Sequence, residues 1–191
     1  MSTRLVLIAS IIFVAQGCVF TPQAVKVMPK IDVSPTMSGG GHPVTVKVVD
    51  ERPRRTLGTR GASGYGADLT IEGDLVSIIR DAVVEGMQQH NFKPLTGSNP
   101  EGRELRVEIR NLDYDVTDEF WAYKIRVVYG LKAICIRDTS RPYEQHYHGE
   151  HVSRALMTKS AEQNNTYVSD AVSVAVNSLL RDEKLRSCLA K

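Results

Sequence analysis

The sequence predicts an α+β domain: a mostly antiparallel sheet of about four strands with two helices packed on one face, in the order β-α-β-β-β-α. Apolar residues alternate with a period of two in four separate stretches, as they do in half-buried strands. They recur with helical spacing in two others, at residues 75–87 and 168–185. No internal repeat is visible, so we expect one domain over residues 44–191.

The first strand and the first helix are separated by a long loop. Valines alternate along residues 44–49, which predicts a strand. Asp50 to Gly73 is rich in Gly and Arg, but its glycine spacing matches no phosphate-binding motif, so we expect a mobile loop. A helix is predicted from Leu75 to Met87, with Asp74 placed to favour the helix dipole. Gly86 lies on its apolar face and predicts a close approach to the sheet.

Three further strands are predicted before the last helix. The second strand begins near Arg103, and its apolar pattern changes phase near Arg110–Asn111, which predicts a β-bulge. One apolar face then runs unbroken from Trp121 to Cys135, which indicates a single long, bent strand. A turn at residues 137–142 leads into a returning strand that starts with residues 143–149.

The N-terminal segment predicts export and lipidation. Residues 1–17 combine a positively charged start with an apolar run, Leu5–Val14, that is too short to span a bilayer. Small residues before Cys18 resemble the bacterial lipobox, which implies that Cys18 is lipidated and becomes the first residue of the mature protein. Residues 18–43 contain four prolines and a glycine triplet and predict a flexible tether, within which Ala24–Met28 could pair with a sheet edge.

The charge balance gives no electrostatic case for nucleic acid as a partner. The formal net charge is +2, and the densest basic block is Arg52–Arg55. We interpret that block as a solvated loop rather than as a nucleic-acid patch.

The cysteines allow two interpretations. A lipidated Cys18 leaves Cys135 and Cys188 as an even pair in an oxidising compartment. A bridge between them would contribute about 4 kcal/mol in the chain-entropy model. Because Cys188 lies outside the apolar stripe of the last helix, a buried free thiol at Cys135 is favoured over the disulfide.

Several stretches of the chain together resemble a known family. They are the lipobox at Cys18, Val48-Val49-Asp50-Glu51-Arg52, Leu57-Gly58, the helix from Leu75 to Met87, Val168-Ser169-Asp170-Ala171-Val172 and Val176-Asn177-Ser178-Leu179-Leu180. The chain resembles the YajG-type bacterial lipoproteins, which are largely uncharacterised. The resemblance implies an outer-membrane lipoprotein that faces the periplasm, with no accepted catalytic site to carry over. Val19 is not the Asp that resembles an inner-membrane retention signal.

A histidine pair is the candidate metal site. On a strand, His146 and His148 would project from one face about 7 Å apart, a spacing that can share zinc or copper. His151 falls in the opposite phase. The alternative, which we favour, is a polar solvent-facing strand face.

Two other patterns each lack part of the functional motif that they resemble. An acid-rich bend between strands lacks the glycine and terminal glutamate of a calcium loop, so we interpret it as a solvated turn. Its members are Asp113, Asp115, Asp118 and Glu119. Ser63 lacks the strand-to-helix elbow of a nucleophilic serine.

These observations predict a lipid-anchored outer-membrane protein that is not an enzyme, uses no cofactor, and binds another envelope component through its periplasmic domain. The partner would be an envelope protein or a peptidoglycan-associated component. The favoured surface is the loop Arg52–Gly66, with contacts from Arg52, Arg54, Arg55 and Tyr65. The alternative is a periplasmic metal-binding protein using His146 and His148. A third is a cell-wall hydrolase, which would need an acid pair in a cleft.

Overall fold

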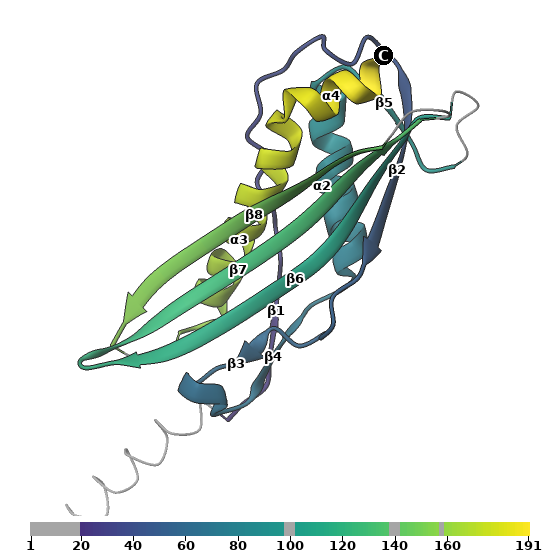
Figure 1. The fold of residues 1–191 in the computed structure, drawn as a ribbon. Coiled ribbons are helices and arrows are strands. Elements are labelled where there is room, and N and C mark those ends of the chain that lie inside the picture. Colours follow the sequence, from purple (N-terminus) through teal and green to yellow (C-terminus); the bar gives the residue numbers. More distant parts are fainter. Residues whose placement is uncertain (1–19, 98–101, 138–141, 157–158) are drawn as a thin grey trace, which may run out of the picture.

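A computed structural model describes residues 20–97, 102–137, 142–156 and 159–191. These residues form eight strands in one mixed sheet, with helices packed on one of its faces (Figure 1). The strands are β1 (Gln23–Val25), β2 (Pro43–Asp50), β3 (Gly58–Thr59), β4 (Asp68–Ile71), β5 (Lys93–Leu95), β6 (Glu104–Glu119), β7 (Ala122–Ile136) and β8 (Tyr143–Ala155). The helices are α2 (Leu75–Gln89), α3 (Ala161–Arg181) and α4 (Glu183–Ala190), with a 3₁₀ turn, η1, at Ala62–Gly64.

The predicted sheet of about four mostly antiparallel strands with two helices is therefore wrong. Four of the eight strands have only two to four residues, too few to show a periodic pattern. The strands β2 and β6 are parallel, with Val46 beside Leu105, because α2 carries the chain back across the sheet between them.

Strand β6 is the centre of the sheet. It pairs with β7 along its whole length, from Glu104 opposite Ile136 to Glu119 opposite Ala122. On its other edge its first half pairs with β2, and Tyr114 pairs with β3. The predicted bulge is confirmed, since the β6–β7 register shifts between Ile109 and Asn111.

The far end of the β6–β7 hairpin differs from its prediction. Phe120 and Trp121 form the two-residue turn, with Phe120 89% and Trp121 80% exposed, so Trp121 does not belong to a strand face. The predicted bend at Asp113–Glu119 is also wrong, because those residues continue β6. The two long strands run directly into each other through a tighter turn than expected.

The helices begin and end at clear capping residues. Helix α2 follows Asp74, as predicted. Helix α3 begins at Ala161 rather than near residue 168, after a capping box formed by Ser160 and Gln163. It ends at Asp182, whose carboxylate caps α4, so the predicted single helix over residues 168–185 is wrong.

Two glycines mark where α3 packs most closely. A Cβ on Gly149 of β8 would lie 1.9 Å from the Ala171 carbonyl oxygen, so the helix backbone lies directly on the strand. A Cβ on Gly86 of α2 would lie 2.1 Å from Leu180 Cδ1. The close approach predicted at Gly86 is therefore to α3, not to the sheet.

The segment before β2 is docked along α3 (Figure 1). Alternate backbone N–H groups of this extended segment donate to polar side chains spaced four residues apart on the helix. The bonds are Lys26 N to Asn165 Oδ1 (2.9 Å), Met28 N to Ser169 Oγ (2.9 Å), Lys30 N to Ser173 Oγ (2.9 Å) and Asp32 N to Asn177 Oδ1 (2.8 Å). We call this set the amide ladder.

The flexible tether predicted for residues 18–43 is thus wrong over the part that carries the amide ladder. Val25, Val27 and Val33 are 0%, 4% and 8% exposed and belong to the core. The expected pairing of Ala24–Met28 with a sheet edge is confirmed in part, because β1 pairs in parallel with β4. Prolines keep the segment extended without making it loose.

Cys135 and Cys188 form a disulfide with a Cα–Cα distance of 6.5 Å. The preferred interpretation of Cys135 as a free thiol is therefore wrong. The apolar stripe used in that argument assumed one helix through residue 185, whereas Cys188 lies on the separate helix α4, which packs on β7.

Replacing both bridged cysteines with serine should lower the free energy of unfolding by about 4 kcal/mol, because the bridge closes a 53-residue separation. Chemical denaturation of wild type and the double variant checks this. Wild type treated with reductant should unfold like the variant, and the variant should not respond to reductant. Alkylation of both thiols in unfolded, unreduced wild type would contradict the bridge.

Candidate functional site

The loop Arg52–Gly66 does not present its four predicted contact residues as one surface. The Arg52 side chain is only 5% exposed, whereas those of Arg54 and Arg55 are 64% and 69% exposed. Tyr65 is 65% exposed. The structure therefore separates a structural residue, Arg52, from three that can reach a partner.

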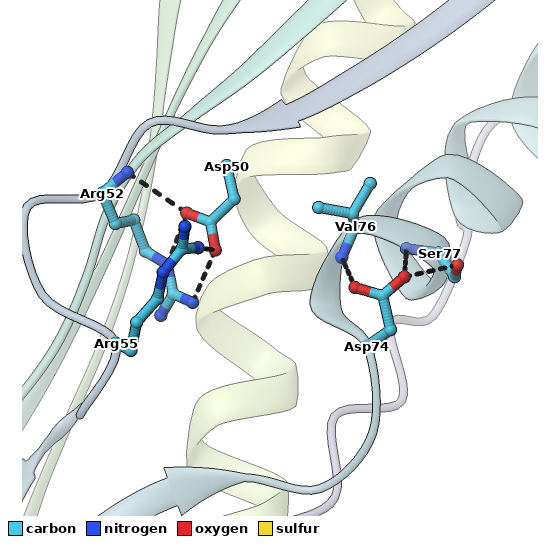
Figure 2. Close-up of polar contacts among 6 residues, drawn as sticks. All are labelled: Asp50, Arg52, Arg55, Asp74, Val76 and Ser77. Atoms are coloured by element: carbon cyan, nitrogen blue, oxygen red, sulfur yellow. Dashed lines mark hydrogen bonds and ion pairs between the residues drawn. The ribbon is translucent and has the colours of Figure 1, made fainter.

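Asp50, at the end of β2, organises the start of this loop (Figure 2). Its carboxylate accepts hydrogen bonds from the Arg52 backbone N–H at 3.1 Å and from Arg52 Nε and Nη2 at 2.9 and 2.8 Å. Arg55 Nη1 donates to the same carboxylate. The Asp50 side chain is 8% exposed, so this is a nearly buried ion pair with a second cation at its outer side.

The electrostatics of this corner keep Asp50 ionised. Burial alone would raise the pKa of Asp50, but the hydrogen bonds from Arg52 and the charges of Arg52 and Arg55 outweigh burial and lower it. Burial also raises the pKa of the nearby Tyr129 hydroxyl well above its usual value. The Asp50 carboxylate is therefore suited to holding the loop in place rather than to exchanging protons.

A hollow of about 310 Å³ lies between this corner and the start of α2. The Asp74 carboxylate accepts hydrogen bonds from Val76 N, Ser77 N and Ser77 Oγ, at 3.1, 3.2 and 2.7 Å (Figure 2). The Ser77 hydroxyl bond is the main reason that the pKa of Asp74 is lowered. Because Asp74 already occupies the helix N-terminus, this hollow offers no anion site there.

A larger cleft of about 600 Å³ lies between the glycine-rich loop and the outer half of the β6–β7 hairpin. We call it the hairpin cleft. Its loop side includes Gly58, Thr59, Gly61, Ser63 and Gly64, and its hairpin side includes Tyr114, Asp115, Thr117, Glu119, Lys124 and Arg126, with Arg54 at the edge. The loop side was expected from the sequence, but the hairpin side was not, because the acidic residues of β6 from Asp113 to Glu119 were interpreted as a solvated turn.

The charges around the hairpin cleft are mixed and largely paired. Arg54 Nη2 lies 2.8 Å from Asp113 Oδ1, and Arg126 Nε lies 2.6 Å from Glu150 Oε1. Arg154 bonds Glu119 at 2.8 Å, and this bond lowers the pKa of Glu119. The cleft therefore suits a partner that carries both signs of charge, not a simple anion or cation.

Tyr65 lies at the outer end of the loop, against the first described residue. Its ring packs edge-on to that of Phe20, with the centroids 5.2 Å apart. Arg60 Nη1 donates to the Thr21 carbonyl oxygen at 3.0 Å, and this bond also holds the loop against the first described residues. Tyr65 therefore belongs to the region around the N-terminal segment rather than to the Asp50 corner.

His146 and His148 are both exposed on β8, on the same face as predicted. Lys132 is opposite His146 in the sheet and bonds Glu144 at 2.6 Å, so a cation lies beside the predicted metal ligands. His151 lies 3.3 Å from Asp170 and stacks on Tyr167. Within the described ranges, no three His, Cys, Asp or Glu side chains are grouped to hold a metal ion.

A family model described as "Uncharacterized lipoprotein" matches residues 29–190. The chain belongs to the YajG family of uncharacterised lipoproteins. The predicted resemblance is confirmed, and membership makes the protein a membrane-anchored lipoprotein of the cell envelope. Cys18 and the predicted signal peptide at residues 1–17 lie outside the described residues and before the matched range.

Two solved structures are similar to this YajG-family chain to different degrees. A Xanthomonas campestris protein of the family DUF330 has a TM-score of 0.54 and 12% identity, over 84% of this chain and 91% of that one. A putative neuraminyllactose-binding hemagglutinin homolog from Helicobacter pylori has a TM-score of 0.44 and 9% identity, over 82% and 93%. The first likeness concerns the fold alone. No curated protein sequence matches the chain, and no helix in the described part is long and apolar enough to cross a membrane.

Asp50→Asn should lower the free energy of unfolding by about 3–5 kcal/mol, because it leaves the buried Arg52 guanidinium without its main counter-charge. Asp81→Asn is the matched control: its side chain is 74% exposed, and we expect a change within about 0.5 kcal/mol. Urea unfolding of the purified proteins measures both. Equal effects of the two substitutions would show that the corner is not a stabilising pair.

The same pair should give the protein an acid-sensitive component of stability. Because the folded-state pKa of Asp50 lies below 3.8, this stabilisation is present above that unfolded value and is lost as the pH falls through the folded pKa. Below pH 4, the free energy of unfolding of wild type should therefore fall more steeply than that of Asp50→Asn.

Metal binding by His146 and His148 stays a prediction. If the pair binds zinc or copper, the added ion should raise the melting temperature, and His148→Ala should remove the increase. Lys132→Ala should strengthen the effect by removing the neighbouring cation. Thermal unfolding with and without each metal measures this, and an unchanged wild-type melting temperature with both metals would contradict it.

Proposed function

We propose that this YajG-family protein is anchored in the outer membrane by lipid on Cys18 and that its periplasmic domain, without catalysing a reaction, binds another envelope component at the hairpin cleft. The observation that carries the proposal is the cleft itself, about 600 Å³ and bordered by the exposed Arg54. Its mixed charges favour a protein surface as the partner, and a peptidoglycan-associated component is the other candidate.

The state of the carboxyl groups supports a binding role over a hydrolytic one. A general acid in a hydrolase needs a carboxyl group with a raised pKa. Among the described residues, five carboxyl groups have a pKa below the ordinary value. They are Asp50, Asp74, Glu119, Glu150 and Asp182, and each accepts hydrogen bonds that stabilise its anion.

The rigid placement of both sides of the cleft also supports binding. The loop side is held by Asp50 at its start and by the pairing of Gly58 with Tyr114. The hairpin side is a continuous pair of long strands. A binding surface built on fixed elements loses little conformational entropy when a partner docks.

A photo-crosslinking residue at position 54 in the full-length protein should form a discrete adduct in living cells, because Arg54 lies at the edge of the cleft. The control is the same residue at position 174, since Val174 is 49% exposed on α3. Arg126→Glu should reduce the adduct from position 54 by reversing a charge inside the cleft.

Two outcomes would contradict the proposal. One is the absence of an adduct from position 54, and the other is the same adduct with equal yield from position 174. Mass spectrometry of the mature N-terminus and fractionation of the two membranes test the anchor separately. An unacylated Cys18 would remove the lipid anchor from the proposal.

A further inference from the structure

Exposed aromatic side chains gather at one end of the molecule. Among the described residues, the large exposed aromatic side chains are Phe20, Tyr65, Phe120 and Trp121. They come from the start of the described chain, the loop after η1 and the turn of the β6–β7 hairpin. In Figure 1 these three elements lie at the same end, away from α4 and β5. Leu156, 79% exposed, follows Ala155, which pairs with Tyr123 beside the same turn.

Nothing in the folding of the hairpin calls for Phe120 and Trp121. Two-residue hairpin turns favour Gly, Asn and Asp, which adopt positive φ angles easily. Here the turn holds two large apolar residues, and neither has a positive φ. Their rings contact each other with centroids 4.7 Å apart, yet both remain almost fully exposed. Phe120 and Trp121 are unusual residues for this turn, and neither becomes buried by being there. Such a combination indicates that the two residues have a functional role.

The first described residues, from Phe20 onward, bring the predicted lipid to this end. Cys18 is two positions before Phe20, so covalent geometry keeps their Cα atoms within about 8 Å. Phe20 packs on Tyr65, and Arg60 holds the Thr21 carbonyl oxygen. The amide ladder then binds the following residues to α3. Because this segment is docked, the short chain from Phe20 to Cys18 keeps the attachment point of the lipid near this end of the domain.

We propose that this end of the domain lies on the membrane leaflet that holds the anchor, with the Phe120–Trp121 turn inserted at the level of the lipid headgroups. The inference rests on the lipid anchor of the proposed function. Tryptophan and tyrosine favour this depth because their rings are apolar at one end and polar at the other. The domain thus stands in a defined orientation, with the Phe120–Trp121 end toward the lipid.

The charges near the turn predict that insertion depends on the aromatic rings and not on anionic lipid. Asp118 and Glu119 precede the turn, while Lys124 and Arg154 lie close behind it, and Arg154 bonds Glu119. The two signs balance, so a negatively charged membrane gains little attraction. The carboxylates also oppose deep insertion, which limits the turn to the interface.

The test uses Trp121, which is the only tryptophan of the chain. Full-length acylated protein is reconstituted into phosphatidylethanolamine vesicles with and without phosphatidylglycerol, and co-flotation shows that it is anchored. We expect Trp121 to emit at shorter wavelength than in the unfolded protein and to be quenched strongly by lipids brominated on the upper acyl chain. Quenching of Trp121 by aqueous acrylamide should be several-fold weaker than in the unfolded protein. Phosphatidylglycerol should change these values little.

Two variants serve as matched comparisons. Trp121→Phe combined with Met37→Trp moves the reporter to an equally exposed site, since Met37 is 77% exposed near the end of α2. That tryptophan should be quenched by acrylamide and not by brominated lipid. Phe120→Ser keeps Trp121 and should weaken its quenching by lipid, with unchanged thermal unfolding because Phe120 is exposed.

The outcomes separate the two proposals. Protein that floats with the vesicles while Trp121 stays in water overturns the inference and leaves the anchor intact, and the hairpin turn would then be free for a protein partner. Equal lipid quenching of the two tryptophan positions also overturns it. Protein that does not float overturns the lipid anchor, and the inference fails with it.

Discussion

The amide ladder between residues 26–32 and α3 is the interaction on which the architecture of this protein depends. Two residues of extended chain advance by about 6.6 Å and one helical step of four residues by about 6 Å, so the two repeats stay nearly in register. Asn165, Ser169, Ser173 and Asn177 can therefore each accept from an alternate backbone N–H. A segment that would otherwise leave these donors unpaired becomes an edge of the fold.

The ladder also supports the outer half of the sheet. Strand β1 directly precedes the ladder in the chain and pairs with β4, β4 pairs with β3, and β3 meets β6 at one residue pair. These strands are too short to be stable alone. Their position therefore depends on β1 from one side and on the Asp50 corner from the other, and together these two contacts place the glycine-rich loop beside the hairpin.

Long periodic elements could be predicted from the sequence, and contacts between distant segments could not. Helix α2, strand β7 from Ala122 onward and the bulge near Asn111 each show a pattern over many residues. The parallel pairing of β2 with β6, the short strands and the disulfide depend on which segments meet in space. The proline-rich segment before β2 was predicted to be a flexible tether, and only its pairing with polar side chains of α3 shows otherwise.

The candidate site shows the same division between local pattern and spatial context. The sequence indicated the loop, but Arg52 and Arg54 looked alike within one basic block, and burial alone separates a structural guanidinium from an exposed one. Trp121 fitted the alternation of the strand that follows it, so its place in a turn was hidden. The informative signal was the pair Phe120–Trp121 taken together, because two adjacent large apolar residues face opposite sides of a strand and cannot both reach one core. Asp118 and Glu119 come directly before this pair. A turn that presents both rings to the membrane interface, as proposed above, explains this order of residues better than a strand does.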